Sequence, residues 1–140
     1  MSNDQKVMKV ASLVLLAWSL AVLVFDVIAI VTVASGGWGV GGFLLVILYT
    51  FEGLFGFWVG MKGVKGANTP SKAGTFNVGA LILALVEVFC LIFTLVTGTD
   101  VAGRALADDV PMVVLECIAL AACLAGWFAG RRVLTAALDK

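Results

Sequence analysis

The sequence predicts an all-α membrane protein, folded as a four-transmembrane-helix bundle in a single integral membrane domain. Of its 140 residues, 62% are hydrophobic and 13% are charged, whereas about 25% of the residues in soluble domains are charged. Apolar runs long enough to cross the hydrocarbon core of a bilayer, about 30 Å thick, recur four times. These runs cover residues 10–34, 41–61, 76–97 and 110–130.

Each run has an identifiable boundary. The run 10–34 is too long for the apolar part of a signal peptide and is not followed by a clear cleavage site, so we treat it as a spanning helix. The Gly-rich stretch 36–42 predicts a tight turn before the second helix. The segment 62–72 (KGVKGANTPSK) has the Gly, Asn, Pro and Ser content of a solvated loop and divides the chain into two helical hairpins.

The two hairpins resemble each other weakly. The first helix of each carries one acid, Asp26 or Glu87, and the second carries Glu52 or Glu116, followed by Trp, Gly and basic residues. This pattern suggests two parallel helical-hairpin repeats. The alternative is that apolar helices resemble each other by composition alone.

The basic residues predict the topology. Eight of the nine, all except Arg104, lie at the two termini or between positions 62 and 72. By the positive-inside rule, both termini and the loop 62–75 are therefore cytoplasmic, and the connection 99–109 is external. We expect a multi-pass protein of the plasma (inner) membrane.

Several classes of protein are excluded or disfavoured. The chain has no His, which excludes His-based catalytic triads, HExxH zinc sites and haem ligation by His. No phosphate-binding loop, dinucleotide fingerprint or nucleic-acid-binding patch is present. Cys90, Cys117 and Cys123 all fall inside predicted helices and suggest no disulfide framework. We therefore expect no enzymatic activity, no nucleic-acid partner and no cofactor other than a bound cation.

The feature that points to function is one acid in each apolar run: Asp26, Glu52, Glu87 and Glu116. No Lys, Arg or His lies within these runs to neutralise the acids. A charged side chain at the centre of a membrane helix costs about 2.5–3.5 kcal/mol even on the most permissive scale. One acid in every helix therefore predicts a shared site.

Helical spacing predicts that these acids face the bundle interior. Small or weakly polar residues, which membrane helices place at mutual contacts, share a face with each acid. Glu52 and Glu87 lie near the midplane, while Asp26 and Glu116 lie somewhat nearer the external side, at depths within about 6–9 Å of one another. The sequence thus predicts one carboxylate cluster, with Asp108 and Asp109 above it at the external mouth.

Oxygen ligands without His or thiolate favour hard ions or protons over zinc or copper. Tyr49, Ser19 and Thr94 are further candidate ligands, and aromatic residues would allow an organic cation. The metal, if there is one, is not identified by the sequence and would use the same carboxylates. The predicted function is binding and transport of a cation (proton, metal or organic cation) through the intramembrane carboxylate cluster.

Two other interpretations remain open. In the first, the acids are protonated and simply form hydrogen bonds between helices, although such bonds average only about 0.6 kcal/mol. Alternatively, the chain is a non-transporting tetraspan accessory or scaffold subunit whose acids pair with basic residues of a partner membrane protein. Because a chain this short has little room for a complete pathway, we expect a homo-oligomer or a membrane partner subunit in addition to the lipid bilayer.

Overall fold

The computed structural model describes residues 1–139 and contains four long helices. They are α1 (Asn3–Ala34), α2 (Gly39–Asn68), α3 (Ala73–Thr97) and α4 (Val110–Leu138), with short 3-10 turns η1 (Pro70–Lys72) and η2 (Leu106–Asp108). Each of the four helices is long and apolar enough to cross a membrane. The predicted all-α four-helix bundle is therefore confirmed, and the chain has the architecture of a multi-pass membrane protein.

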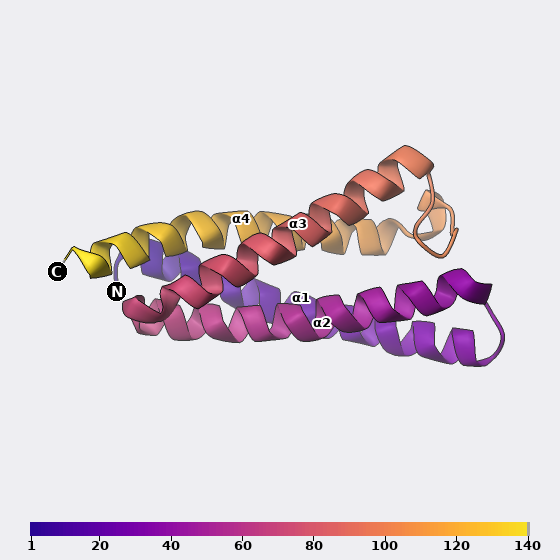
Figure 1. Ribbon diagram of the computed structural model, residues 1–140, viewed down its shortest axis with the longest axis horizontal. Helices are drawn as coiled ribbons and strands as arrows, with labels where there is room; N and C mark the ends of the chain where they lie inside the picture. Colours follow the sequence, from indigo (N-terminus) through magenta and orange to yellow (C-terminus); the bar gives the residue numbers. More distant parts are fainter. Residues whose placement is uncertain (140) are drawn as a thin grey trace.

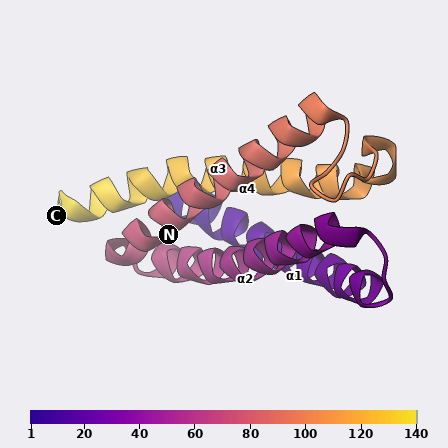
Figure 2. The ribbon, with the colours of Figure 1, turned by 45° about the vertical axis from the view of Figure 1, so that its right-hand side comes forward.

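The helices run up and down, so the connections gather at two ends of the bundle (Figure 1). Both termini and the α2–α3 connection lie at one end, called here the terminal end. The connections 35–38 and 98–109 lie at the other, called here the loop end. Figures 1 and 2 both show α1 beside α2, and α3 crossing α4 obliquely so that its loop end diverges from α2.

All four helices continue past the predicted apolar runs at the terminal end. α1 begins at Asn3, before the predicted start at 10, and its first turn is closed by a capping box between Ser2 and Gln5. α3 begins at Ala73, α2 continues to Asn68 and α4 to Leu138. The first part of the predicted loop 62–72 is therefore helical.

A row of glycines allows α2 to pack tightly against α1. A Cβ atom at Gly56 would lie 2.5 Å from the ring of Trp18, and one at Gly60 would lie 2.8 Å from the Leu16 side chain. A Cβ atom at Gly53 would lie 2.6 Å from Leu23. The glycines thus let the two backbones approach closely, as small residues do in other membrane helix pairs.

An apolar layer closes the terminal half of the bundle. Phe76 of α3 is fully buried, and its ring packs against three glycines on neighbouring helices, Gly63, Gly126 and Gly130. Other fully buried apolar side chains of the core include Met8, Leu15, Val59 and Leu83. The four intramembrane acids lie between this layer and the loop end.

Candidate carboxylate site

All four intramembrane acids are buried. The exposed fraction of the residue is 0% for Glu52 and Glu87, 5% for Asp26 and 6% for Glu116. Every acid thus faces the bundle interior, as the small-residue stripes indicated.

Three of these acids lie together. Glu52 of α2, Glu87 of α3 and Glu116 of α4 are close enough to interact electrostatically, with Glu87 and Glu116 each acted on by Glu52. We call these three residues the carboxylate cluster. The cluster draws one side chain from each of three helices.

The carboxylate cluster is poorly supplied with hydrogen-bond donors. The Cys90 thiol donates to Glu52 Oε1 over 3.5 Å. Within residues 1–139, both oxygens of Glu87 and the Oε2 atoms of Glu52 and Glu116 are buried without a hydrogen-bond partner. Buried polar atoms in native proteins nearly always have partners, so four unpartnered oxygens in one cluster call for an explanation.

Asp26 lies apart from this cluster. Its Oδ2 atom accepts a hydrogen bond from the Thr50 hydroxyl over 2.7 Å. Thr50 and Glu52 are two positions apart on α2, and residues with that spacing do not share a helix face. Asp26 therefore contacts a different side of α2 from the side that carries Glu52.

Of the other candidate ligands, some also lie near the carboxylate cluster and one lies away from it. Ser19 is buried, but its hydroxyl donates to the Leu16 carbonyl of its own helix over 2.8 Å. Tyr49 and Thr94 are buried and line a small cavity together with Glu116. The structure thus brings Tyr49 and Thr94 to the carboxylate cluster, while the Ser19 proton is already used within α1.

This cavity is lined by Glu116 of the carboxylate cluster and by residues of the external connection. Its volume of about 10 Å³ for the centre of a water-sized sphere is close to the minimum that holds one water molecule. The polar part of its lining is Tyr49, Cys90, Thr94, Asp100, Asp109 and Glu116. The cavity therefore joins side chains of the external connection to side chains of the membrane helices.

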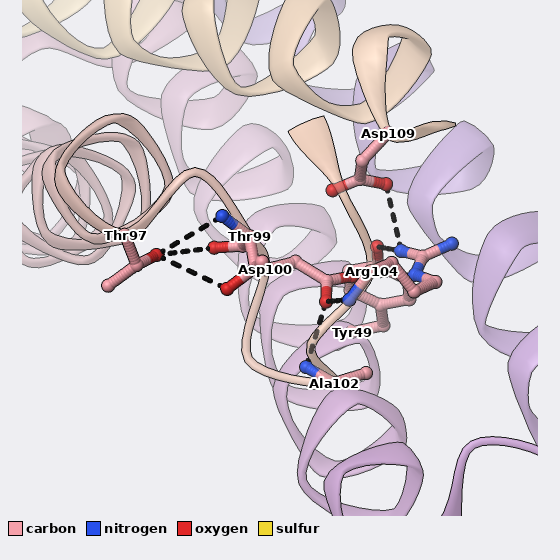
Figure 3. Close-up of polar contacts among 7 residues, drawn as sticks. All are labelled: Tyr49, Thr97, Thr99, Asp100, Ala102, Arg104 and Asp109. Carbon is pink, nitrogen blue, oxygen red and sulfur yellow. Dashed lines mark hydrogen bonds and ion pairs between the residues drawn. The ribbon is translucent and has the colours of Figure 1, made fainter. Parts of the chain in front are cut away.

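Arg104 lies at the loop end and contacts Tyr49, Asp100 and Asp109 (Figure 3). Its guanidinium donates to Asp100 Oδ2 over 2.6 Å and to Asp109 Oδ1 over 2.8 Å. It also donates to the Tyr49 hydroxyl over 3.1 Å and lies 4.6 Å from the centre of the Trp38 ring. We call this arrangement of Arg104 and its four contact residues the Arg104 cap.

The loop that carries Arg104 is well defined by its own hydrogen bonds. Asp100 Oδ1 accepts the backbone N–H groups of Ala102 and Arg104, both over 2.9 Å. Leu106 N–H donates to the Gly98 carbonyl over 2.9 Å. Such carboxylate-to-backbone bonds fix a turn, so the guanidinium is presented from a structured loop.

Burial and charge act in opposite directions on the ionisable groups of the cap. Burial raises the pKa of Asp109 to about 6, although the Arg104 charge opposes the rise. Burial also disfavours the charged form of Arg104, but its hydrogen bond to Asp100 and the neighbouring acids keep its pKa above the ordinary value. Arg104 therefore stays a cation.

Sequence reasoning missed Arg104 and Cys90 as contacts of the site. Arg104 was treated only as one charge of the external connection, and Cys90 as a small hydrophobe. One signal for Arg104 was present, because it is the only basic residue between Lys72 and Arg131 and lies among Asp100, Asp108 and Asp109. Of the two acids expected at the external mouth, Asp109 lines the cavity and Asp108 is exposed.

Among the described residues, no group of three or more Cys, Asp or Glu side chains is arranged to hold a metal ion. Comparison with known proteins finds no matching family model, no similar curated protein and no similar solved structure. The function is therefore argued from the geometry of the site.

Proposed function

We propose that this protein is an integral membrane protein that binds a cation, and transports it, through the carboxylate cluster of Glu52, Glu87 and Glu116. The observation that carries this proposal is Glu87. Its side chain is fully buried between two other acids, and neither of its oxygens has a partner in the described chain. Intramembrane acids placed in this way typically mark ion or proton pathways.

A proton is the cation that best fits this geometry. A proton on one carboxyl group converts an acceptor oxygen into a donor, which can then bond to a neighbouring carboxylate. One proton thus supplies a partner to two oxygens and relieves repulsion between like charges. The cavity beside Glu116, which has room for about one water molecule, is too small for an organic cation.

The two halves of the bundle differ in a way that suits a binding site reached from one side. Polar side chains line the cavity between Glu116 and the loop end. Phe76 and its apolar neighbours fill the terminal half, together with the buried polar side chains of Ser12 and Asn77. Transport therefore requires a second conformation in which the Phe76 layer opens. We further propose that both termini are cytoplasmic, that the membrane is the plasma (inner) membrane, and that the protein associates with a second copy or a partner subunit.

Binding is tested by thermal unfolding of the purified protein across pH 5.5–8 and with monovalent, divalent and organic cations. A ligand that binds only the folded state stabilises it by about 2.7 kcal/mol at one hundred times its dissociation constant. We expect the unsubstituted protein to show proton-dependent or cation-dependent stabilisation. We expect Glu87→Gln, and the Glu52→Gln, Glu87→Gln pair, to fold but lose it, because Gln keeps the shape and removes the titratable charge.

Asp26→Asn is the matched control, since it neutralises a buried membrane acid outside the cluster and keeps an oxygen that can accept from Thr50. It should retain the stabilisation. If the unsubstituted protein responds to no cation and to no pH change in this range, the accessory-subunit interpretation becomes the better one.

Transport is tested separately in reconstituted vesicles that contain a pH-sensitive dye. We expect an imposed potential to drive proton flux through the unsubstituted protein and not through Glu87→Gln. Cation-dependent stabilisation without any flux would reduce the function to binding.

A further inference from the structure

The Arg104 cap uses the same side chains that line the route to the carboxylate cluster. Tyr49, Asp100 and Asp109 each bond to the Arg104 guanidinium, and each also lines the cavity beside Glu116. Asp100 and Asp109 also act electrostatically on Glu116 itself. Arg104, the chain's own cation, is therefore bonded to three of the residues that line the cavity beside Glu116.

The cap also joins parts of the chain that are distant in sequence. Arg104 belongs to the α3–α4 connection, Tyr49 to α2 and Trp38 to the α1–α2 connection. Figure 3 shows the guanidinium between Asp109 and the Tyr49–Asp100 side of the site. Because Arg104 bridges the two helical hairpins at the end where α3 diverges from α2, breaking its contacts would free that end to open (Figures 1 and 2).

If Arg104 served only to stabilise its own loop, its contacts with Tyr49 and Trp38 would not be needed. Asp100 already fixes the loop through two backbone bonds, and these do not involve the Arg104 side chain. The remaining interactions of the guanidinium reach out of the loop to Tyr49 and Trp38. Only 22% of the Arg104 side chain is exposed, so the guanidinium is largely enclosed by its contact residues.

We propose that Arg104 is a gate residue, whose guanidinium closes the route from the loop end to Glu116 and must leave Asp109 and Tyr49 before a cation can enter. This inference rests on the proposed function, because it concerns access to the same carboxylates. A cation that enters takes the place of the guanidinium between Asp100 and Asp109. Closure by Arg104 and entry of a cation are therefore mutually exclusive.

The test measures access to Glu116 and needs no transport. The purified protein is treated with a water-soluble, positively charged carbodiimide, which is larger than the closed cavity and reaches Glu116 only when the loop end opens. Modification of Glu116 is followed by peptide mass spectrometry. In Arg104→Ala we expect labelling to accelerate about tenfold or more, because three hydrogen bonds of a charged group that hold the gate closed are lost. Methylguanidinium should slow the labelling of Arg104→Ala again, since it replaces the missing group.

Two further variants sharpen the result. Arg104→Lys keeps the charge but not the planar donor geometry, and should label at an intermediate rate. Arg131→Ala is the matched control, because Arg131 also stacks on a tryptophan, at 5.0 Å from the Trp127 ring, but at the terminal end. Its labelling of Glu116 should equal that of the unsubstituted protein.

Equal labelling of Glu116 in folded Arg104→Ala and in the unsubstituted protein would overturn the gate. If Arg104→Ala does not fold, Tyr49→Phe removes only the hydroxyl that accepts from Arg104, and unchanged labelling there has the same meaning. The experiments distinguish failure of the gate proposal from failure of the proposed function. Faster labelling of Arg104→Ala without any cation-dependent stabilisation rejects the proposed function, whereas stabilisation with unchanged labelling rejects the gate alone.

Discussion

At the residue scale, the carboxyl group of Glu87 destabilises the bundle that buries it. Neither of its oxygens has a partner in residues 1–139, and the side chain is fully buried. Leaving a buried polar group without a hydrogen bond costs about 1–3 kcal/mol. A residue that lowers stability in this way is expected where activity, and not packing, requires the side chain.

This cost leads to a prediction for an apolar substitution. Glu87→Met keeps a similar volume without polar atoms, and should raise the free energy of unfolding by about 1–3 kcal/mol while abolishing cation binding. Thermal unfolding in a single detergent at neutral pH measures the change. Asp26→Leu should give a smaller gain, because Asp26 Oδ2 accepts a bond from Thr50 and only Oδ1 is buried without a partner. A lower melting temperature for Glu87→Met would contradict the prediction.

A second residue-scale prediction concerns Asp109, whose pKa is raised by burial to about 6. Because the unfolded carboxyl group titrates near 3.9, the folded state binds the proton more tightly, and the contribution of Asp109 to stability falls as pH rises between about 4 and 6. The Asp109→Asn variant has no carboxyl group at this position and therefore lacks this pH-dependent contribution to stability. The melting temperature of the unsubstituted protein minus that of Asp109→Asn should therefore decrease from pH 4 to pH 6 and then level off.

The adjacent Asp108 provides the control for that measurement. It is exposed, so Asp108→Asn should show a constant difference over the same range. A constant difference for Asp109→Asn as well would mean that the carboxyl group is not desolvated in the folded protein.

The sequence indicated the burial of the acids but not all of their partners. Small residues three, four and seven positions away indicated that each acid faces inward. The depth argument placed all four acids in one cluster, and this was wrong for Asp26, which bonds to Thr50 instead. The separation of Asp26 was not predictable, because it depends on how far α1 is rotated against α2. The contacts of Arg104 could not be predicted either, since a loop has no periodicity that shows where its side chains point.

At the element scale, the α1–α2 contact depends on glycines that leave no room for a side chain. A Cβ atom at Gly63 would clash with the Ser12 hydroxyl and lie 2.7 Å from the Phe76 ring. Both neighbours are fully buried, so neither has space to retreat. The contact is therefore intolerant of a single methyl group.

We predict that Gly63→Ala destabilises the protein by about 1–3 kcal/mol, the usual cost of overpacking a core. Gly74→Ala is the matched control, because the nearest atom to a Cβ there is 3.8 Å away. That change should be neutral or stabilise by about 0.5–1 kcal/mol, since Ala favours a helix more than Gly does. Denaturation of both variants in one detergent gives the comparison, and equal stability of the two would refute the packing argument.

The positions of helix ends could be predicted only where Gly, Ser or Pro residues stand at them in the sequence. The ends of α1 and α3 and the start of α4 coincide with Gly, Ser or Pro and agree with the predicted runs 10–34, 76–97 and 110–130. The extensions at the terminal end were missed because hydropathy detects the part of a helix that lies in lipid. Capping, as at Ser2, decides where a helix begins.

At the scale of the whole molecule, the distribution of basic residues distinguishes the two ends of the helical bundle. Of the eight basic residues within positions 1–139, seven lie at the terminal end and Arg104 alone lies at the loop end. Because cytoplasmic loops are enriched in Lys and Arg, the terminal end should face the cytoplasm.

Labelling of intact cells tests this orientation. Lys72→Cys and Ala107→Cys both place a thiol at an exposed position, at opposite ends of the bundle. A membrane-impermeant maleimide should label Ala107→Cys from outside and label Lys72→Cys only after the cells are broken. The parent protein, with its three native cysteines, supplies the background. External labelling of Lys72→Cys would reverse the topology and with it the side from which the carboxylate cluster is reached.

The glycine row of α2 has a consequence for how the nascent chain enters the bilayer. α2 is the least apolar of the four spans and carries Glu52, so it gains least from lipid on its own. Its glycine face is covered by α1, which leaves the ribosome first. We therefore expect α1 to remain beside the translocation channel until α2 emerges, and the two helices to be released into lipid as a preassembled pair.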